Sequence, residues 1–178
     1  METPLTPFEF QRRARTLYPE RDCVIDGATR LTYEQFFARC DRWSVALQRL
    51  GVRKGDRVAY ISLNTSAQLA SYYAVPQIGA VLVPINFRLH PQEIQYILQH
   101  CGAKVVCAHA DFLETVEAIR GSCPAVEHYV ALEGTHEGWL DYERLLEAET
   151  GGPDRPQVDE RDLLTINYTS GTTARPKG

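Results

Sequence analysis

The middle of the chain alternates between short apolar runs and amphipathic stretches. Four β-prone runs recur about every 23 residues, at 57–63, 80–85, 103–109 and 126–132. The stretches between them repeat apolar residues at helical spacing. Strands that are apolar on both faces and are joined by helices are typical of a parallel sheet covered on each side. The pattern therefore predicts an α/β fold, with a mainly parallel sheet flanked by helices.

One helix is delimited at both ends by local signals, within "LTYEQFFARCDRWSVALQRLG", residues 31–51. Thr32 and Gln35 form a capping-box pair, in which each side chain satisfies a free backbone N–H. Gly51 can adopt the left-handed conformation that ends a helix. The helical spacing predicts one buried stripe, made of Phe36, Cys40, Trp43, Leu47 and Leu50.

The next helix is expected within "SAQLASYYAVPQIG", residues 66–79. We expect Pro76 to kink it, because proline lacks a backbone N–H, and Gly79 to end it. One face of this helix combines Leu69, Tyr72 and Tyr73.

Further elements have their own start signals. A helix at 90–102 begins with Pro91 in its first turn, and one at 111–121 begins with a second capping box, Asp111 with Glu114. A short amphipathic helix is predicted at 139–149. Near the other end, "VIDGATRLTY" (24–33) has Asp-Gly between two β-prone runs, which predicts a hairpin.

These patterns divide the chain into four parts. We interpret residues 1–22 as an N-terminal extension and 23–150 as β-α units. Residues 151–162 are rich in proline, glycine and charge, which is typical of a surface connection. Residues 163–178 are predicted to be a strand, "LLTINY" (163–168), followed by a polar loop.

Composition excludes several classes of protein. With 44% hydrophobic and 24% charged residues, the chain is typical of a soluble globular protein. A net charge of −4 argues against a nucleic-acid-binding protein. No apolar stretch approaches the roughly 20 residues that a transmembrane helix needs, and the first 22 residues lack the apolar core of a signal peptide. We therefore expect a cytoplasmic protein without a transmembrane segment.

The cysteines and histidines give no sign of a metal site. The five cysteines are odd in number and contain no CxxC pair, and the five histidines have no metal-like spacing. Cys40 and Cys101 fall on apolar helix faces, where small buried thiols are common.

The last residues, "TSGTTARPKG" (169–178), concentrate groups that bind phosphate. Gly171 allows consecutive backbone N–H groups to converge on an anion, and Lys177 adds a positive charge. Such a set suits a polyphosphate, although an ordinary polar loop is the alternative. The hydroxyl donors are Thr169, Ser170, Thr172 and Thr173.

The loop does not fit the Walker pattern G-x-x-x-x-G-K-[ST]. If Gly171 and Lys177 are aligned with it, Pro176 replaces the second glycine and Gly178 replaces the hydroxyl that binds magnesium. Proline has neither a donor N–H nor the required freedom of φ.

Residues 168–178 closely resemble the signature Y-T-S-G-T-T-G-x-P-K-G of the adenylate-forming (AMP-binding) enzymes, which include acyl-CoA synthetases, firefly luciferase and peptide-synthetase adenylation domains. All fixed positions but one match. "LTYEQF", "GVRKGDRVAYISLN", "YYAVPQIGAVLVPINFRLHPQEIQYILQHCGAKVV" and "DLLTINYTSGTT" resemble further family landmarks in family order. The resemblance extends from about residue 24 to residue 178, and residues 85–98 are most similar to the fatty-acyl-CoA ligase branch.

The resemblance implies a two-step reaction. A carboxylate attacks the α-phosphorus of ATP to give an acyl-adenylate and pyrophosphate, and a thiol, usually CoA, then takes the acyl group. Mg²⁺ and the donors of the loop would offset the repulsion between the two anionic substrates. The implied partners are small molecules: a carboxylic acid, ATP and CoA. The resemblance leaves homo-oligomerisation open.

The resemblance also assigns roles within the loop. Lys177 would orient the leaving pyrophosphate, and Thr169 would lie near Mg²⁺. Ala174 replaces a family glycine, at a cost on the order of 1 kcal/mol if that position needs a positive φ. Gly178 completes the signature. The residues implied to bind the β- and γ-phosphates are Thr169, Ser170, Gly171, Thr172 and Thr173. Ala174, Lys177 and Gly178 complete the predicted phosphate-binding set.

Two interpretations of the whole chain remain at this point. Family members continue for several hundred residues past this signature, with the ribose-binding aspartate, the acyl pocket and the main catalytic lysine. The chain is therefore expected to be the N-terminal portion of an acid–CoA ligase, incomplete and inactive by itself. The alternative is a non-catalytic binding or assembly module that has kept the early part of that domain.

Overall fold

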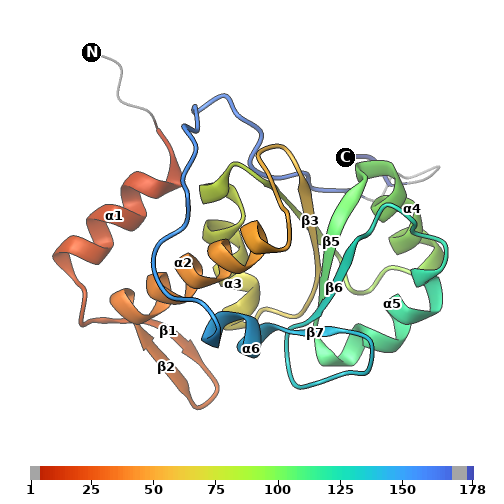
Figure 1. Cartoon of the computed structure of the whole chain (residues 1–178), viewed down its shortest axis with the longest axis horizontal. Helices are drawn as coiled ribbons and strands as arrows, with labels where there is room; N and C mark the ends of the chain where they lie inside the picture. Colours follow the sequence, from red (N-terminus) through yellow and green to blue (C-terminus); the bar gives the residue numbers. More distant parts are fainter. Residues whose placement is uncertain (1–4, 170–175) are drawn as a thin grey trace.

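The centre of the fold is a five-stranded parallel sheet (Figure 1). The structure is a computed structural model that describes residues 5–169 and 176–178. The strand order is β4-β3-β5-β6-β7, and each neighbouring pair is parallel. The strands are β3 (Arg57–Ile61), β4 (Val81–Ile85), β5 (Ala103–Ala108), β6 (His128–Ala131) and β7 (Leu140–Asp141). The predicted α/β class is confirmed, and β7 is a strand that the sequence pattern did not predict.

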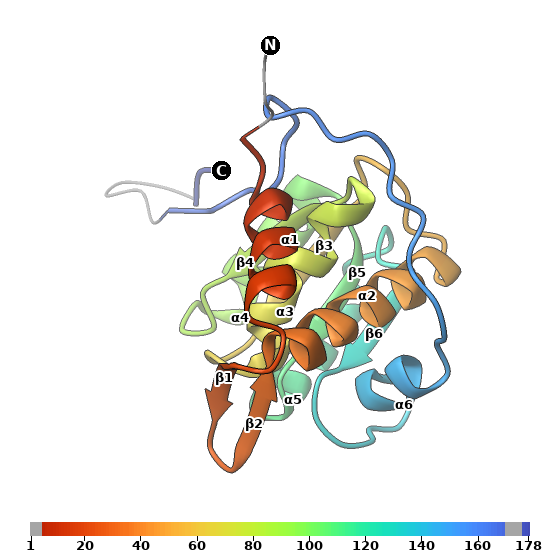
Figure 2. The ribbon, with the colours of Figure 1, turned by 90° about the vertical axis from the view of Figure 1, so that its left-hand side faces the viewer.

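Helices cover both faces of the sheet. In Figure 1, α2, α3 and α6 lie to the left of the sheet, and α4 and α5 lie to its right. Figure 2 shows that α1 lies on the outer side of the first group. The helices are α1 (Pro7–Leu17), α2 (Tyr33–Arg49), α3 (Ser66–Ala74), α4 (Pro91–Cys101), α5 (Leu113–Arg120) and α6 (Tyr142–Glu147).

Alternate residues of each strand belong to two separate hydrophobic cores. Val58 and Tyr60 of β3 pack with α2 and α3, whereas Ala59 and Ile61 pack with α4 and α5. Side chains of a strand point alternately to opposite faces, so the central positions of a strand covered on both sides are expected to be apolar in succession. This two-sided burial explains the continuous apolar runs in the sequence.

The signals at the ends of α2 are confirmed. The Gln35 N–H donates to Thr32 Oγ1 (3.3 Å), and the Thr32 N–H donates to Gln35 Oε1 (2.9 Å). Gly51 has φ of 84° and follows the helix. Four members of the predicted stripe are at most 1% exposed, and Leu50 is partly buried.

The chain around Pro76 differs from the predicted kink. The helix α3 ends at Ala74, and a separate 3₁₀ turn, η1 (Pro76–Ile78), follows before Gly79 at φ of 74°. A proline cannot donate the hydrogen bond that continues an α-helix, so the helix stops instead of bending. Small residues of α3 pack inward, whereas Leu69 and Tyr72 remain exposed.

The second predicted capping box is wrong. A 3₁₀ turn, η2 (Ala110–Phe112), precedes α5, and no side chain caps α5 itself. The N–H of Asp111 donates to the His109 imidazole (3.2 Å). The imidazole therefore caps the earlier turn, and the predicted partner Glu114 lies inside the first turn of α5.

Outside the central sheet, the hairpin agrees with the prediction and two other segments differ from it. The N-terminal extension contains α1, and the predicted hairpin forms from β1 (Asp22–Asp26) and β2 (Thr29–Thr32), which pair antiparallel. The predicted strand 163–168 is wrong as a strand, because within the described residues it makes one parallel bridge, between Leu82 and Thr165. In the part of the chain that the structure describes, no helix is long and apolar enough to cross a bilayer.

Candidate nucleotide-binding site

Residues 163–168 follow the outer edge of β4 and carry the chain to the candidate loop. The N–H of Leu82 donates to the carbonyl of Leu164, and the N–H of Ile166 donates to the carbonyl of Leu82 (2.9 Å each). The segment runs parallel to β4, so its final residue lies at the carboxyl edge of the sheet. Ligands of open α/β sheets bind beyond this edge.

The two ends of the loop are paired with each other. The N–H of Thr169 donates to the carbonyl of Lys177 (2.9 Å), and the N–H of Lys177 donates to the carbonyl of Thr169 (3.1 Å). Residues opposite each other in an antiparallel pair point to the same face. The Thr169 hydroxyl and the Lys177 amine therefore share a face, and both residues are exposed.

The remaining predicted phosphate-binding residues lie outside the described residues. They are Ser170, Gly171, Thr172, Thr173 and Ala174. The structure thus brings together Thr169, Lys177 and Gly178 of the predicted set, at the base of the loop.

Tyr168 and Gly178 pack directly against each other beside this base. A Cβ built on Gly178 would lie 2.8 Å from the Tyr168 ring, closer than real Cβ atoms come. The residue after Lys177 must therefore be a glycine while the ring stays in place. Tyr168 is partly buried against the core on the α4 side, and this burial raises the pKa of its hydroxyl.

His100, to which the sequence assigned no role, contacts this site. Its Nδ1 lies 2.6 Å from the Tyr168 hydroxyl, and the two rings meet edge to face with centroids 5.7 Å apart. Tyr96, one helical turn earlier, stacks on the His100 ring at 5.4 Å. In the sequence, the i, i+4 spacing of Tyr96 and His100 could have indicated that these two rings stack. Their contact with Tyr168 could not have been inferred, because Tyr168 is remote in sequence.

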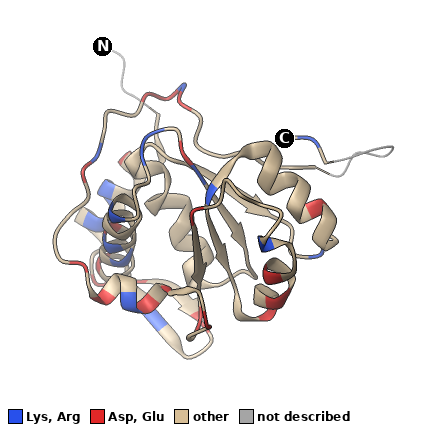
Figure 3. Cartoon of the chain, turned by 45° about the vertical axis from the view of Figure 1, so that its right-hand side comes forward, with Lys and Arg blue, Asp and Glu red and all other residues tan. Residues whose placement is uncertain are grey.

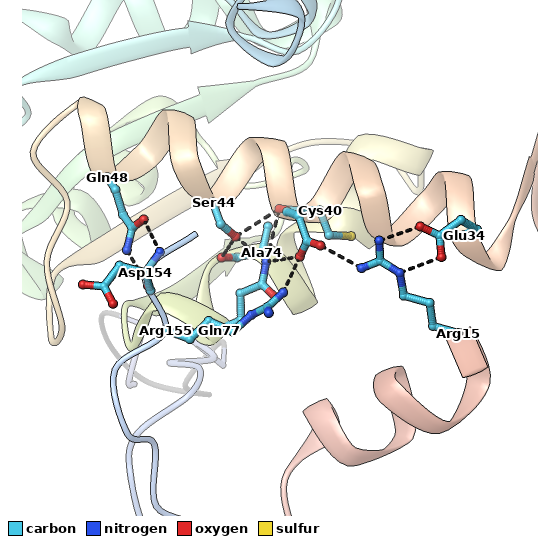
Figure 4. Close-up of polar contacts among 10 residues, drawn as sticks. Arg15, Glu34, Cys40, Ser44, Gln48, Ala74, Gln77, Asp154 and Arg155 are labelled. Carbon is cyan, nitrogen blue, oxygen red and sulfur yellow. Dashed lines mark hydrogen bonds and ion pairs between the residues drawn. The ribbon is translucent and has the colours of Figure 1, made fainter. Parts of the chain in front are cut away.

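The connection 151–162 is fixed to α2 and to the turn that follows it. Gln48 and the backbone of Asp154 exchange two hydrogen bonds, of 2.6 and 3.1 Å (Figure 4). Lys54 donates to the Gln157 carbonyl (3.0 Å) and to Asp162 (2.8 Å), and the bond from Lys54 lowers the pKa of the Asp162 carboxyl. The segment that leads to the loop is therefore attached at several points.

Asp41 of α2 joins this connection to α1. Its carboxylate accepts from Arg15 (2.7 Å) and from Arg155 (2.6 Å), and also from the amide of the buried Gln77 (3.3 Å). The Asp41 side chain is 13% exposed. Basic and acidic residues are mixed over the helices in this region (Figure 3), and they form pairs across elements.

Comparison with known proteins identifies the family. The family model described as "AMP-binding enzyme" matches residues 10–178, which includes the paired ends of the loop. The chain belongs to this family. The architecture of this AMP-binding chain also matches the first part of the N-terminal domain of adenylate-forming enzymes.

Relatives of this AMP-binding chain are CoA ligases and an acyl-activating enzyme. A long-chain-fatty-acid–CoA ligase of Thermus thermophilus is 40% identical over 183 residues, which cover 100% of this chain and 33% of the relative. A probable acyl-activating enzyme of Arabidopsis thaliana is 37% identical, covering 98% of this chain and 36% of the relative. The chain thus spans about a third of the length of these relatives.

A solved structure agrees with these similarities. The crystal structure of an anthranilate CoA ligase in complex with anthranoyl-AMP superposes with a TM-score of 0.93 and 29% sequence identity. The match covers 99% of this chain and 34% of the ligase. The fold of this AMP-binding chain is therefore that of the corresponding part of a larger ligase.

Proposed function

We propose that this chain is the N-terminal portion of an ATP-dependent carboxylic acid–CoA ligase that forms an acyl-adenylate and releases pyrophosphate. The observation that carries this proposal is the pairing of Thr169 with Lys177 at the carboxyl edge of the parallel sheet. The pairing places a hydroxyl donor and an ammonium group on one face of the loop's base. A signature loop closed in this way suits the triphosphate of a nucleotide.

In each step of the proposed reaction, one bond forms and one bond breaks at the atom under attack. An oxygen of the carboxylate attacks the α-phosphorus of ATP, the bond to the bridging oxygen breaks, and pyrophosphate leaves. The thiol of CoA then attacks the acyl carbon, its proton is lost, and AMP leaves. ATP and CoA are thus co-substrates of the proposed enzyme.

We assign the loop residues to the pyrophosphate end of ATP. Lys177 would neutralise the leaving pyrophosphate as charge develops on it, which favours the transition state over the bound substrate. Ala174 and Gly178 are assigned to the same set and have no polar side chain. The residues proposed to bind the β- and γ-phosphates are Thr169, Ser170, Gly171, Thr172 and Thr173.

Mg²⁺ would supply further neutralisation of the phosphates when bound. The Thr169 hydroxyl is an oxygen donor of the type that Mg²⁺ accepts. Among residues 5–169 and 176–178, no group of three histidine, cysteine or acidic side chains is arranged to hold a metal ion. We assign to the Thr169 hydroxyl a contact with the ion.

The acid is proposed to be a fatty or related carboxylic acid. The similar proteins include a long-chain-fatty-acid–CoA ligase and a ligase of an aromatic acid, anthranilate. Residues 85–98, which resemble the fatty-acyl branch, support the aliphatic choice. Since the chain spans about a third of such enzymes, we also propose that it does not complete the reaction by itself.

Pyrophosphate exchange into ATP tests the proposal, with the protein extended to the length of its relatives and a panel of aliphatic and aromatic acids. We expect exchange that depends on one class of acid and falls at least tenfold in Lys177→Met. Arg144→Met removes an exposed cation of α6 and serves as the matched control. The proposal would be overturned if none of the acids supported exchange, or if the Lys177→Met protein were as active as the control.

A further inference from the structure

One aromatic ring links the base of the candidate loop to α4. Tyr168 immediately precedes Thr169, and its ring lies between the backbone of Gly178 and the side chain of His100. His100 belongs to the last turn of α4, which is packed on the sheet through Ile94, Ile97 and Leu98. The ring thus connects a rigid helix with both ends of the loop.

We infer that His100 is a positioning residue for the phosphate-binding loop. It holds the Tyr168 ring against Gly178, and this contact fixes the register in which Thr169 faces Lys177. Among residues 5–169 and 176–178, the hydrogen bond and ring contacts of His100 are with Tyr96 and Tyr168 and not with Thr169 or Lys177, so we assign its effect to Tyr168. The part of the inference that concerns ATP rests on the proposed function, whereas the part that concerns the loop's base does not.

In the hydrogen bond between Tyr168 and His100, the tyrosine hydroxyl is the donor and the imidazole is the acceptor. A neutral imidazole with its proton on Nε2 accepts the Tyr168 O–H at Nδ1, across the observed 2.6 Å. Tyr96 stacks on the imidazole, so the plane of the acceptor is set by the helix. A tyrosine ring held at its hydroxyl and at its face has little freedom to swing away from the Gly178 backbone.

Consecutive residues of an extended segment point to opposite faces. When Tyr168 is fixed toward α4, Thr169 is directed away from α4, and its backbone is aligned with Lys177. Loss of the hydroxyl contact frees the ring, and the two backbone bonds of the Thr169–Lys177 pair open more often. One ordinary hydrogen bond corresponds to a change of about three- to tenfold in such an opening equilibrium.

Amide hydrogen exchange, followed by NMR on the 178-residue chain, measures that opening directly. We expect His100→Phe, which keeps an aromatic ring beside Tyr96 but removes the acceptor, to speed exchange at the Thr169 and Lys177 amides about three- to tenfold. Tyr168→Phe should give the same change, and the double variant no more than either single one. The amides of β3 should be unaffected in all three.

Rescue by a conservative variant separates positioning from general packing. His100→Asn places a side-chain oxygen near the position of Nδ1 and should restore slow exchange, whereas His100→Leu should not. Unchanged exchange in His100→Phe, faster exchange throughout β3, or failure of asparagine to rescue would each overturn the inference.

The consequence for ATP is tested separately, in the extended ligase. We expect His100→Phe to raise the KM for ATP about three- to tenfold with a smaller change in kcat, because the loop's base is open for a larger fraction of the time. A lowered kcat with unchanged KM would contradict this. The exchange measurement uses no nucleotide, so failure of the ligase proposal leaves its result unaffected.

Discussion

Thr169 and Lys177 face each other across a two-hydrogen-bond antiparallel bridge, although the signature places them at opposite ends of a loop. The bridge makes the loop a closed unit with a defined base.

Ala174, which replaces a family glycine, gives the first prediction. If the position requires a positive φ, Ala174→Gly removes a penalty on the order of 1 kcal/mol. We expect the adenylation rate of the extended protein to stay equal or rise, measured by pyrophosphate release with its preferred acid. A large fall in that rate would contradict the strain that we attribute to alanine.

Asp41 is predicted to stabilise α1 and the connection 151–162 together. Asp41→Ala removes the acceptor that Arg15 and Arg155 share, and a hydrogen bond to a charged group contributes about 1.5–3 kcal/mol. We expect the free energy of unfolding in urea to fall by about that amount. Hydrogen exchange by mass spectrometry should also speed up in 151–162.

The control for Asp41 is an exposed ion pair of the β1–β2 hairpin. Asp22 and Arg30 have side chains 52% and 63% exposed, and such pairs contribute about 0–1 kcal/mol. Asp22→Ala should leave exchange in 151–162 unchanged. An Asp41→Ala protein that behaves like this control would show that the shared carboxylate carries no stability.

The core contains two tyrosines whose hydroxyls should behave oppositely. The Trp43 indole N–H donates to the Tyr60 hydroxyl (2.6 Å) in the core. Tyr60→Phe leaves that donor without an acceptor, so we expect a loss of about 1–3 kcal/mol in unfolding free energy. The buried Tyr129 hydroxyl has no hydrogen-bond partner among the described residues, and Tyr129→Phe should be neutral or stabilising. Equal losses of unfolding free energy in Tyr60→Phe and Tyr129→Phe would contradict the view that only the Tyr60 hydroxyl makes a stabilising hydrogen bond.

The ion pair of Arg15 with Glu34 is predicted to make a pH-dependent contribution to the free energy of unfolding. Arg15 donates to both oxygens of Glu34 (2.7 and 2.6 Å), and this bond lowers the pKa of the Glu34 carboxyl from its ordinary value. A carboxyl whose pKa is lower in the folded state stabilises the fold above its unfolded pKa, near 4.3. That contribution is lost as the pH falls through the folded pKa.

Glu34→Gln tests the sign of this effect. Because the Glu34 side chain is 51% exposed, we expect the variant to be less stable at pH 7 by no more than about 1 kcal/mol. The difference from the parent chain should shrink as the pH falls below about 4. Urea denaturation at a series of pH values measures it, and a difference that grows in acid would refute the pairing.

Local sequence signals predicted the elements well where short-range interactions decide them. The capping box of Thr32 with Gln35 and the left-handed Gly51 fix the ends of α2 within a few residues of chain. The second box failed because His109, outside the expected pair, capped the preceding turn. Residues 163–168 look like a strand by composition, but in the part of the chain that the structure describes they pair with Leu82 of β4 alone.

The sequence by itself determined that strands and helices alternate, where most of them begin and end, and that its last residues resemble the signature of the AMP-binding family. These properties depend on hydrophobic periodicity and on contacts within one or two turns of chain. The tertiary structure alone decided that β3 lies between β4 and β5, that Asp41 joins Arg15 to Arg155, and that His100 meets Tyr168. Each of these contacts joins residues remote in sequence, so it exists only once the sheet and its helices have packed.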